Sequence, residues 1–179
     1  MKGIVFTIFN KMIEDNFGLE VWDGLIERTK PKSEGVYTTA ETYPEAELLN
    51  YVVALSETTN IDAYDLIKTF GEFTFPILAE KYPVFVEGKE LKEFLLSVHD
   101  VIHVEVLKLY PEAQLPTFTY EDVSENKLVM IYESKNDLRA FAEGLINGAA
   151  SFFKKGINQE LQEINVEDGF CVKFTLLIS

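Results

Sequence analysis

The sequence has few of the residues that build metal clusters. Its 179 residues include one cysteine and two histidines. One cysteine excludes an internal disulfide, and the set is too small for a zinc site of about four ligands unless carboxylates complete it. The sequence also lacks a nucleophile elbow, a phosphate-binding glycine loop and a carboxylate dyad, which argues against an enzyme. We expect Cys171 to be a buried small side chain in a strand.

Basic residues are scarce as well. The 16 lysines and arginines are outnumbered by 30 aspartates and glutamates, and the net charge is -14. This charge opposes binding to nucleic-acid phosphates and to anionic lipid surfaces. No apolar run approaches the roughly 20 residues that span a bilayer, and no secretion signal opens the chain. We therefore expect a cytoplasmic protein without nucleic-acid or membrane partners, whose acidic faces are solvated or steer a basic partner.

Hydrophobic periodicity divides the chain into two parts. Up to about Pro111, apolar residues recur every three or four positions, as in helices, and most later segments alternate as strands do. The composition, 47% hydrophobic, suits one compact domain over residues 1–179. The fold class is predicted as α+β, with a helical N-terminal part and a β-β-α-β-β C-terminal part. The predicted helices cover about 4–17, 22–26, 44–55, 62–75, 91–109 and 138–152, and the predicted hairpins pair 117–121 with 127–133 and 161–166 with 170–178.

Both histidines lie on the helix predicted over 91–109, near the junction of the two parts. Taken alone, His103 is more often a core or boundary residue than a ligand. A pair such as His99 and His103 can chelate zinc, but a third protein ligand is not evident. Haem iron needs only one imidazole. In a predicted strand, Tyr132 and Ser134 share a face because side chains alternate, so both hydroxyls can reach one carboxylate, as a haem propionate requires.

The order and spacing of several short motifs resemble the haem-nitric oxide/oxygen binding (H-NOX) family, which is related to the haem domain of soluble guanylate cyclase. The resemblance runs over the whole chain. It implies a four-stranded antiparallel sheet with helices, a distal helical subdomain over about 1–62, and a proximal α/β subdomain over about 63–179 with haem b between them. The motifs are Met1-Lys2-Gly3-Ile4-Val5, Tyr37-Thr38, His103-Val104-Glu105-Val106, Leu115-Pro116-Thr117-Phe118 and Tyr132-x-Ser134.

The resemblance also implies roles for single residues. His103 is the axial ligand of the iron of protoporphyrin IX, Tyr132 and Ser134 bind the propionates, and Pro116 presses on the porphyrin. His99 matches no ligand of the family. The family's propionate motif ends in arginine, but this chain has Asn136, so we expect haem to be held less firmly. Lys135 and Arg139 are both candidates for the missing charge.

The distal side of the expected pocket lacks strong hydrogen-bond donors. In oxygen-binding members of the family, a tyrosine, a tryptophan and an asparagine stand where this chain has Phe141, Phe9 and Thr74. Bound O2 is retained by a donor, whereas NO binds ferrous haem without one. We therefore expect NO and CO binding and no stable O2 complex. The remaining residues expected in this pocket are Val5, Leu78 and Leu145.

The function expected from the resemblance is a sensor. NO binding at a five-coordinate ferrous haem lengthens or breaks the bond to His103, and the porphyrin then flattens against Pro116 and rotates the two parts. The signal passes to a separate histidine kinase, diguanylate cyclase or phosphodiesterase. The alternatives are a haem-linked redox sensor, a carrier of a small apolar ligand with His103 as a polar core residue, and a haem peroxidase or NO-consuming enzyme.

Overall fold

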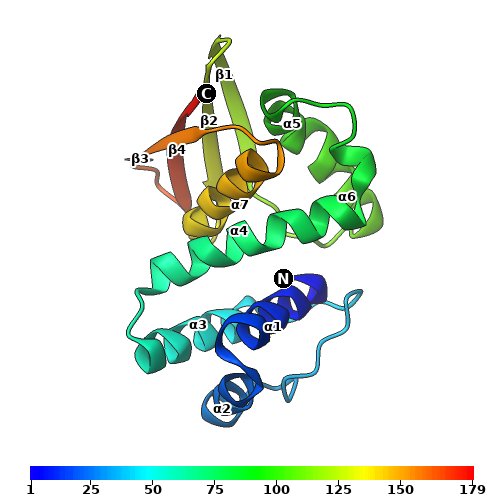
Figure 1. The fold of residues 1–179 in the computed structure, drawn as a ribbon, viewed down its shortest axis with the longest axis vertical. Helices are drawn as coiled ribbons and strands as arrows, with labels where there is room; N and C mark the ends of the chain where they lie inside the picture. The colour runs from blue at the N-terminus through cyan, green and yellow to red at the C-terminus, as the bar shows by residue number, and fades with distance from the viewer.

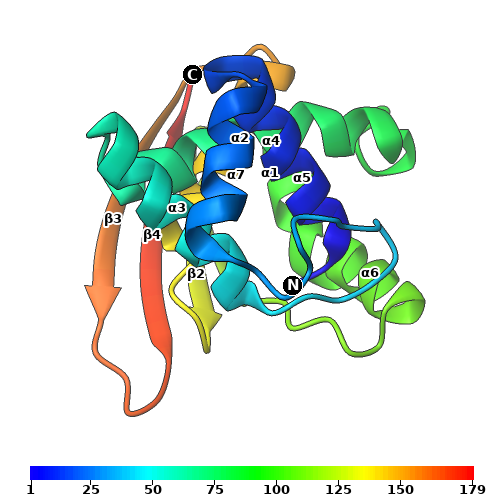
Figure 2. The same cartoon turned by 90° about the horizontal axis from the view of Figure 1, so that it is seen from below.

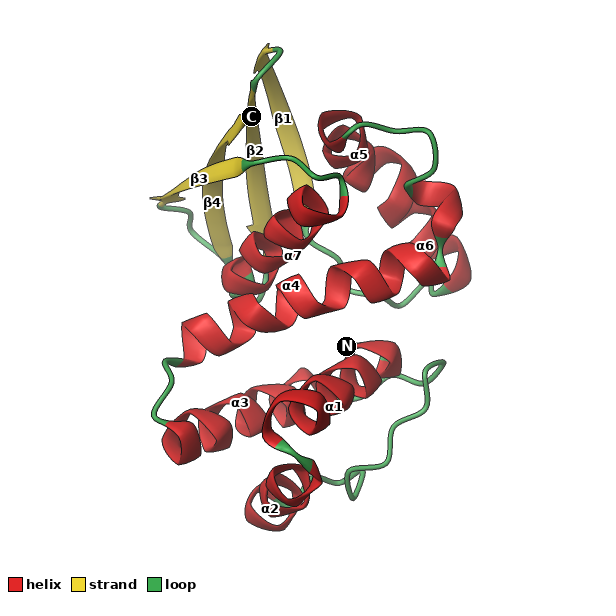
Figure 3. Ribbon diagram, in the orientation of Figure 1, coloured by secondary structure: helices red, strands yellow, loops and turns green.

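The computed structural model describes residues 1–179 and has three layers (Figure 1). Three N-terminal helices form the first layer, two long helices the second, and a four-stranded sheet the third, as the separation of helices from strands in Figure 3 shows. The predicted α+β class is confirmed. The first layer contains α1 (Gly3–Phe17), α2 (Leu19–Thr29) and α3 (Glu45–Thr59), and the second contains α4 (Ala63–Lys81) and α7 (Arg139–Phe152).

The N-terminal layer is built on an aromatic core. Gly18, at φ 93°, ends α1 and lets the chain turn at once into α2. Seen from below in Figure 2, α1, α2 and α3 lie across α4. The first apolar cluster joins these helices to the N-terminal half of α4 through Leu66 and Phe70. In the C-terminal half of α4, Phe75 and Ala79 belong to the second cluster. Both cores therefore meet on one continuous helix.

Helix α4 is longer than predicted. The sequence predicted an end at about Phe75, yet the helix continues to Lys81 with Pro76 inside it. Proline removes one backbone hydrogen bond of a helix. The helix survives because Phe75 and Ala79, on either side of the proline, are buried in the second cluster.

The helical segment that carries the histidines has the predicted bounds, 91–109, but a π-helical turn interrupts its α-helical geometry. It consists of α5 (Leu91–Ser97), a π-helical turn η2 (Val98–His103) and α6 (Val104–Leu109), and it follows a short 3-10 turn η1 (Pro83–Phe85). A π turn inserts an extra residue and shifts the helical phase. Two apolar residues of this segment are exposed, Val101 to 45% and Leu109 to 67%.

The sheet has the order β1-β2-β4-β3, with every neighbouring pair antiparallel. Its strands are β1 (Thr117–Ser124), β2 (Lys127–Ser134), β3 (Ile157–Ile164) and β4 (Phe170–Ile178). The second strand pair was predicted to begin at Leu161, but β3 begins four residues earlier. Its first residues were not predicted because the polar residues at 158–160 show no strand pattern. Cys171 is buried in β4 as expected.

Helix α7 lies between the sheet and α4 (Figure 1). Glycines allow α4 and α7 to touch backbone to backbone: a Cβ atom at Gly71 would overlap the carbonyl oxygen of Phe141, and one at Gly144 would overlap that of Lys68. On the other side of α7, the inner face of the sheet completes the second apolar cluster with Met130, Val172 and Phe174. No helix is both long and apolar enough to cross a bilayer.

Candidate functional site

His103 lies at the last residue of η2, and its two ring nitrogens differ. Nδ1 is completely enclosed and makes no hydrogen bond, while Nε2 also has no partner in the chain but is not enclosed. Burial, with a smaller contribution from His99, lowers the pKa of His103 to about 4, and a polar interaction with the Pro116 backbone partly opposes this. The imidazole is therefore neutral at pH 7 and keeps the lone pair that a metal ion requires.

His99 has a different environment although it lies one turn away. Its Nδ1 accepts a hydrogen bond from the Phe118 backbone N–H at 3.4 Å, and its own backbone N–H lies 3.3 Å from the Tyr120 hydroxyl. These contacts tie η2 to β1. His99 therefore has a packing role in the chain, in line with its lack of a match among the family's ligands.

Phe118 joins His103 to the predicted propionate residues. Its ring centroid lies 5.8 Å from that of His103 and 5.7 Å from that of Tyr132. Phe118 and Tyr132 are direct partners in the register of β1 and β2, which explains their contact. Pro116, half-buried, precedes β1 by one residue, and its backbone lies near the His103 ring. The proximal residues expected from sequence are thus brought together. Phe118 also belongs to this group, although the sequence predicted no role for it.

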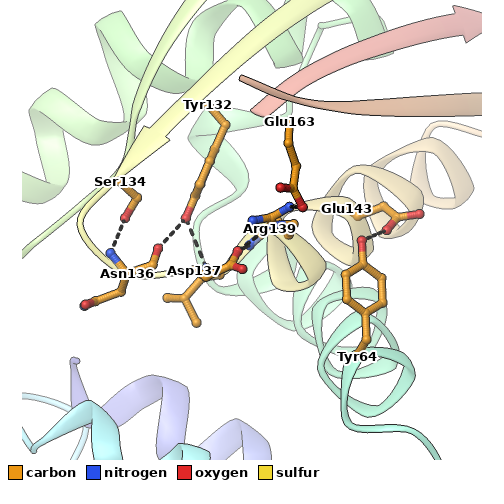
Figure 4. Close-up of polar contacts among 9 residues, drawn as sticks. Tyr64, Tyr132, Ser134, Asn136, Asp137, Arg139, Glu143 and Glu163 are labelled. Carbon is orange, nitrogen blue, oxygen red and sulfur yellow. Dashed lines mark hydrogen bonds and ion pairs between the residues drawn. The ribbon is translucent and has the colours of Figure 1, made fainter. Parts of the chain in front are cut away.

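The predicted propionate residues form a small hydrogen-bonded loop (Figure 4). The Tyr132 hydroxyl donates to the Asn136 carbonyl at 3.2 Å and accepts from the Leu138 N–H at 3.3 Å. Ser134 Oγ accepts from the Asn136 N–H at 3.3 Å, so its own proton remains available. The hydroxyl of Ser134 can therefore donate to a carboxylate directly. The hydroxyl of Tyr132 can do so only after its hydrogen bond to the Asn136 carbonyl breaks.

The two candidate replacements for the missing arginine differ. Arg139 opens α7, where its Nε donates to Asp137 at 2.7 Å and its Nη1 bonds Glu163 (Figure 4). Its guanidinium is thus already occupied by two carboxylates. Lys135 is exposed, makes no ion pair, and borders a cavity of about 390 Å³ that also includes Asp168 and Cys171.

Sequence analysis missed the actual partner of the Asn136 side chain. Its amide donates to Glu45 at the start of α3, with 3.3 Å between Nδ2 and Oε2. The two residues are 91 positions apart. No local sequence pattern predicts such a contact. The only signal in the sequence is that the acidic residue Glu45 directly follows Pro44.

The predicted distal residues lie on α1, α4 and α7. Phe9 and Phe141 both contact Phe70, with ring centroids 5.1 and 5.0 Å apart respectively, so Phe70 links the two expected positions. Thr74, one turn after Phe70, is 1% exposed, and its hydroxyl has no hydrogen-bond partner. The other distal residues, Val5, Leu78 and Leu145, are partly buried against the apolar clusters.

A cavity of about 590 Å³ lies away from this site. It is bordered by residues of α4, of α7 and of the segment that follows α7, among them Glu72, Asn147, Ser151 and Lys155. It contains neither histidine and none of the predicted pocket residues. Its chemistry is therefore separate from that of His103.

Comparison with known proteins decides the family. A sequence profile described as haem-NO-binding matches residues 2–161. The chain belongs to this family, H-NOX. The Fe(II) unliganded H-NOX protein from K. algicida is 40% identical, with a TM-score of 0.91 over 100% of this chain and 97% of that chain. The H-NOX protein from S. oneidensis in the Fe(II)NO ligation state is 32% identical, with a TM-score of 0.88 over 100% of this chain and 99% of that chain.

A more distant H-NOX structure, a mutant protein from T. tengcongensis, shares 23% identity and has a TM-score of 0.92 over 100% of this chain and 98% of that chain, which shows the common fold. The predicted resemblance is confirmed. The chain is a domain of a haem-binding gas-sensor family, and haem is the cofactor that the family binds. The roles of its individual residues remain predictions.

Proposed function

We propose that this H-NOX domain senses nitric oxide with haem b whose iron is held by His103. The observation that carries the proposal is the imidazole itself: it is neutral at pH 7, and Nε2 has no partner within the chain. A metal-binding histidine commonly keeps its second ring nitrogen inside the protein, and here Nδ1 is enclosed, the ring lies beside the Pro116 backbone, and Nε2 is left open for a ligand.

The neighbouring residues fit the rest of the cofactor. Bound haem supplies an iron atom with one open position for a diatomic gas. Ser134 has a free hydroxyl proton for a propionate, and the exposed backbone around Asn136 leaves this end of the site open to solvent. Tyr132 is held in place by its two hydrogen bonds and by its contact with Phe118. These residues bind and orient, and none of them supplies a reactive group, in keeping with a sensor.

The distal residues favour NO and CO over O2. Phe9, Phe70 and Phe141 offer aromatic carbon, and Thr74 offers one buried hydroxyl. A threonine hydroxyl is a weaker and shorter-reaching donor than the phenol that oxygen-binding members carry at the position of Phe141. We therefore expect no stable O2 complex.

We also propose how the signal leaves the site. When the bond between His103 and the iron is released, the distal subdomain over about residues 1–62 shifts against the proximal subdomain over about 63–179. Pro116 lies beside the His103 ring, so it is placed to respond to this release. Helix α4 belongs to both apolar clusters, so it can carry the movement. The receiver is a separate histidine kinase or an enzyme that makes or degrades cyclic di-GMP. A haem-linked redox sensor would use the same residues.

A haem titration tests the assignment of His103. The purified apo-protein should bind one equivalent of haem and develop a Soret band, and His103→Gly should bind haem only when free imidazole is added. A protein that binds an apolar dye but no haem would support the carrier instead. Haem binding by His103→Gly without imidazole would show that another group holds the iron.

A further inference from the structure

One side-chain hydrogen bond joins the N-terminal helices to the proposed propionate loop. It runs from Asn136 Nδ2 to Glu45 Oε2 at 3.3 Å, and no other side-chain hydrogen bond links residues 1–61 to residues 63–179. Glu45 is the first residue of α3, where the positive end of the helix dipole favours a charged carboxylate. The amide that stands in place of the family's arginine is therefore already bound to an anion.

Acidic groups lie close to this contact. Asp137 follows Asn136 directly. Burial raises the pKa of Tyr132, and the negative charges of Asp137 and Glu45 add to this rise. Arg139 is engaged by Asp137 and Glu163, so it does not offset Glu45. The Met1 amino group interacts with the charge of Glu45, but its hydrogen bond goes to the Tyr43 carbonyl.

We propose that Glu45 weakens the retention of haem by repelling the propionate that the loop around Asn136 holds. This inference rests on the proposed haem site. A primary amide has two N–H groups, and Glu45 takes one of them, so a carboxylate that shares the amide stands beside another carboxylate. Like charges in that position raise the free energy of the bound state, and the effect weakens as salt screens it. Glu45 thus tunes how readily the domain exchanges its cofactor.

The sign of the salt dependence distinguishes repulsion from attraction. If a cation held the propionate, salt would weaken the bond and speed haem loss. If Glu45 repels it, salt relieves the repulsion, and haem loss slows as the ionic strength rises. A purely structural role for Glu45 in joining α3 to the loop predicts neither trend.

The experiment measures haem transfer from the ferric holo-protein to an excess of apo-myoglobin at about 0.01 M and 0.3 M salt. Glu45→Gln keeps an oxygen that accepts the Asn136 hydrogen bond but removes the charge. We expect it to slow transfer about threefold to tenfold at low salt and to abolish the salt dependence. Glu45→Lys should slow transfer further. Glu27→Gln, at an exposed residue of α2 without a side-chain hydrogen bond, changes the net charge equally and should behave as the wild type.

Several outcomes overturn the inference. Equal transfer rates for the wild type and Glu45→Gln would show that the carboxylate does not act on haem, and so would wild-type transfer that speeds up with salt. Slowing by Glu27→Gln as large as that by Glu45→Gln would assign the effect to net charge alone. Thermal unfolding of each apo-variant checks that the fold is intact. A wild-type protein that binds no haem would instead overturn the proposed function, which separates the two failures.

Discussion

The rings of His99 and His103 lie 6.2 Å apart on the π turn η2. The Nδ1 atom of His99 accepts a hydrogen bond, whereas the Nδ1 atom of His103 has no partner. His103→Ala should therefore abolish haem binding. His99→Ala should leave the absorption spectrum almost unchanged and cost about 0.5–1.5 kcal/mol of stability, because the Phe118 N–H loses its acceptor. Haem spectra and urea unfolding of both variants check this. Loss of the Soret band in His99→Ala alone would reverse the ligand assignment.

The low pKa of His103 makes the stability of the apo-protein depend on pH. The imidazole has a pKa of about 4 in the folded protein and about 6.5 when unfolded. Between these values the unfolded chain binds a proton that the folded protein does not, so the stability from the neutral ring is full above about pH 6.5 and is lost as the pH falls toward 4. The loss can reach about 3 kcal/mol.

Urea unfolding of the apo-protein between pH 7 and pH 4.5 measures this loss. His103→Leu removes the titrating ring and should unfold with a shallower pH dependence than the wild type. The comparison matters because the many carboxylates of the chain titrate in both proteins alike. Parallel curves for the two proteins would mean that the folded protein does not keep the ring neutral.

The close approach of α4 and α7 gives a prediction about stability. A Cβ atom at Gly144 would overlap the carbonyl oxygen of Lys68, so Gly144→Ala must push the helices apart and should cost about 1–3 kcal/mol. Gly24, inside α2, has open space around its Cα, and Gly24→Ala should instead stabilise the protein by about 0.5–1 kcal/mol. Chemical unfolding of both variants makes the comparison. Equal stabilities would show that the helices tolerate a methyl group at their contact.

The occupied guanidinium of Arg139 bears on haem retention. Asn136→Arg should slow haem transfer to an apo-globin by about one order of magnitude, because it adds a charge-assisted bond to a propionate and a partner for Glu45. Arg139→Gln should leave the rate nearly unchanged, since Asp137 and Glu163 already hold this side chain. Stopped-flow absorbance follows the transfer. Faster loss of haem from Arg139→Gln would mean that Arg139 takes the place of the missing arginine, and Lys135→Gln tests the other candidate.

Much of the fold follows from local patterns. Helices α1 and α7 and strands β2 and β4 have strong periodicity and clear ends, and the sequence predicts them within a few residues. The start of β3 is missed because Asn158, Gln159 and Glu160 have low strand propensity, and pairing with β4 supplies what the local sequence lacks. The extension of α4 past Pro76 likewise depends on burial of the helix.

The candidate site is predictable to the extent that it depends on residue type. One imidazole, two hydroxyls on one strand face and an apolar distal set can be found from sequence. The π turn cannot, because its wider hydrogen bonds depend on how η2 packs against β1. The contact between Glu45 and Asn136 is also beyond local reasoning, since it depends on how two distant elements meet.

The absorption spectrum of the ferrous protein under argon, NO, CO and air shows directly which gas the haem binds. We expect a shifted Soret band with NO and with CO, no stable oxy spectrum in air, and movement toward O2 binding in Phe141→Tyr, which adds a donor beside Phe70. A stable oxy complex in the unmodified protein, or a ferrous spectrum that NO leaves unchanged, would contradict the proposed function.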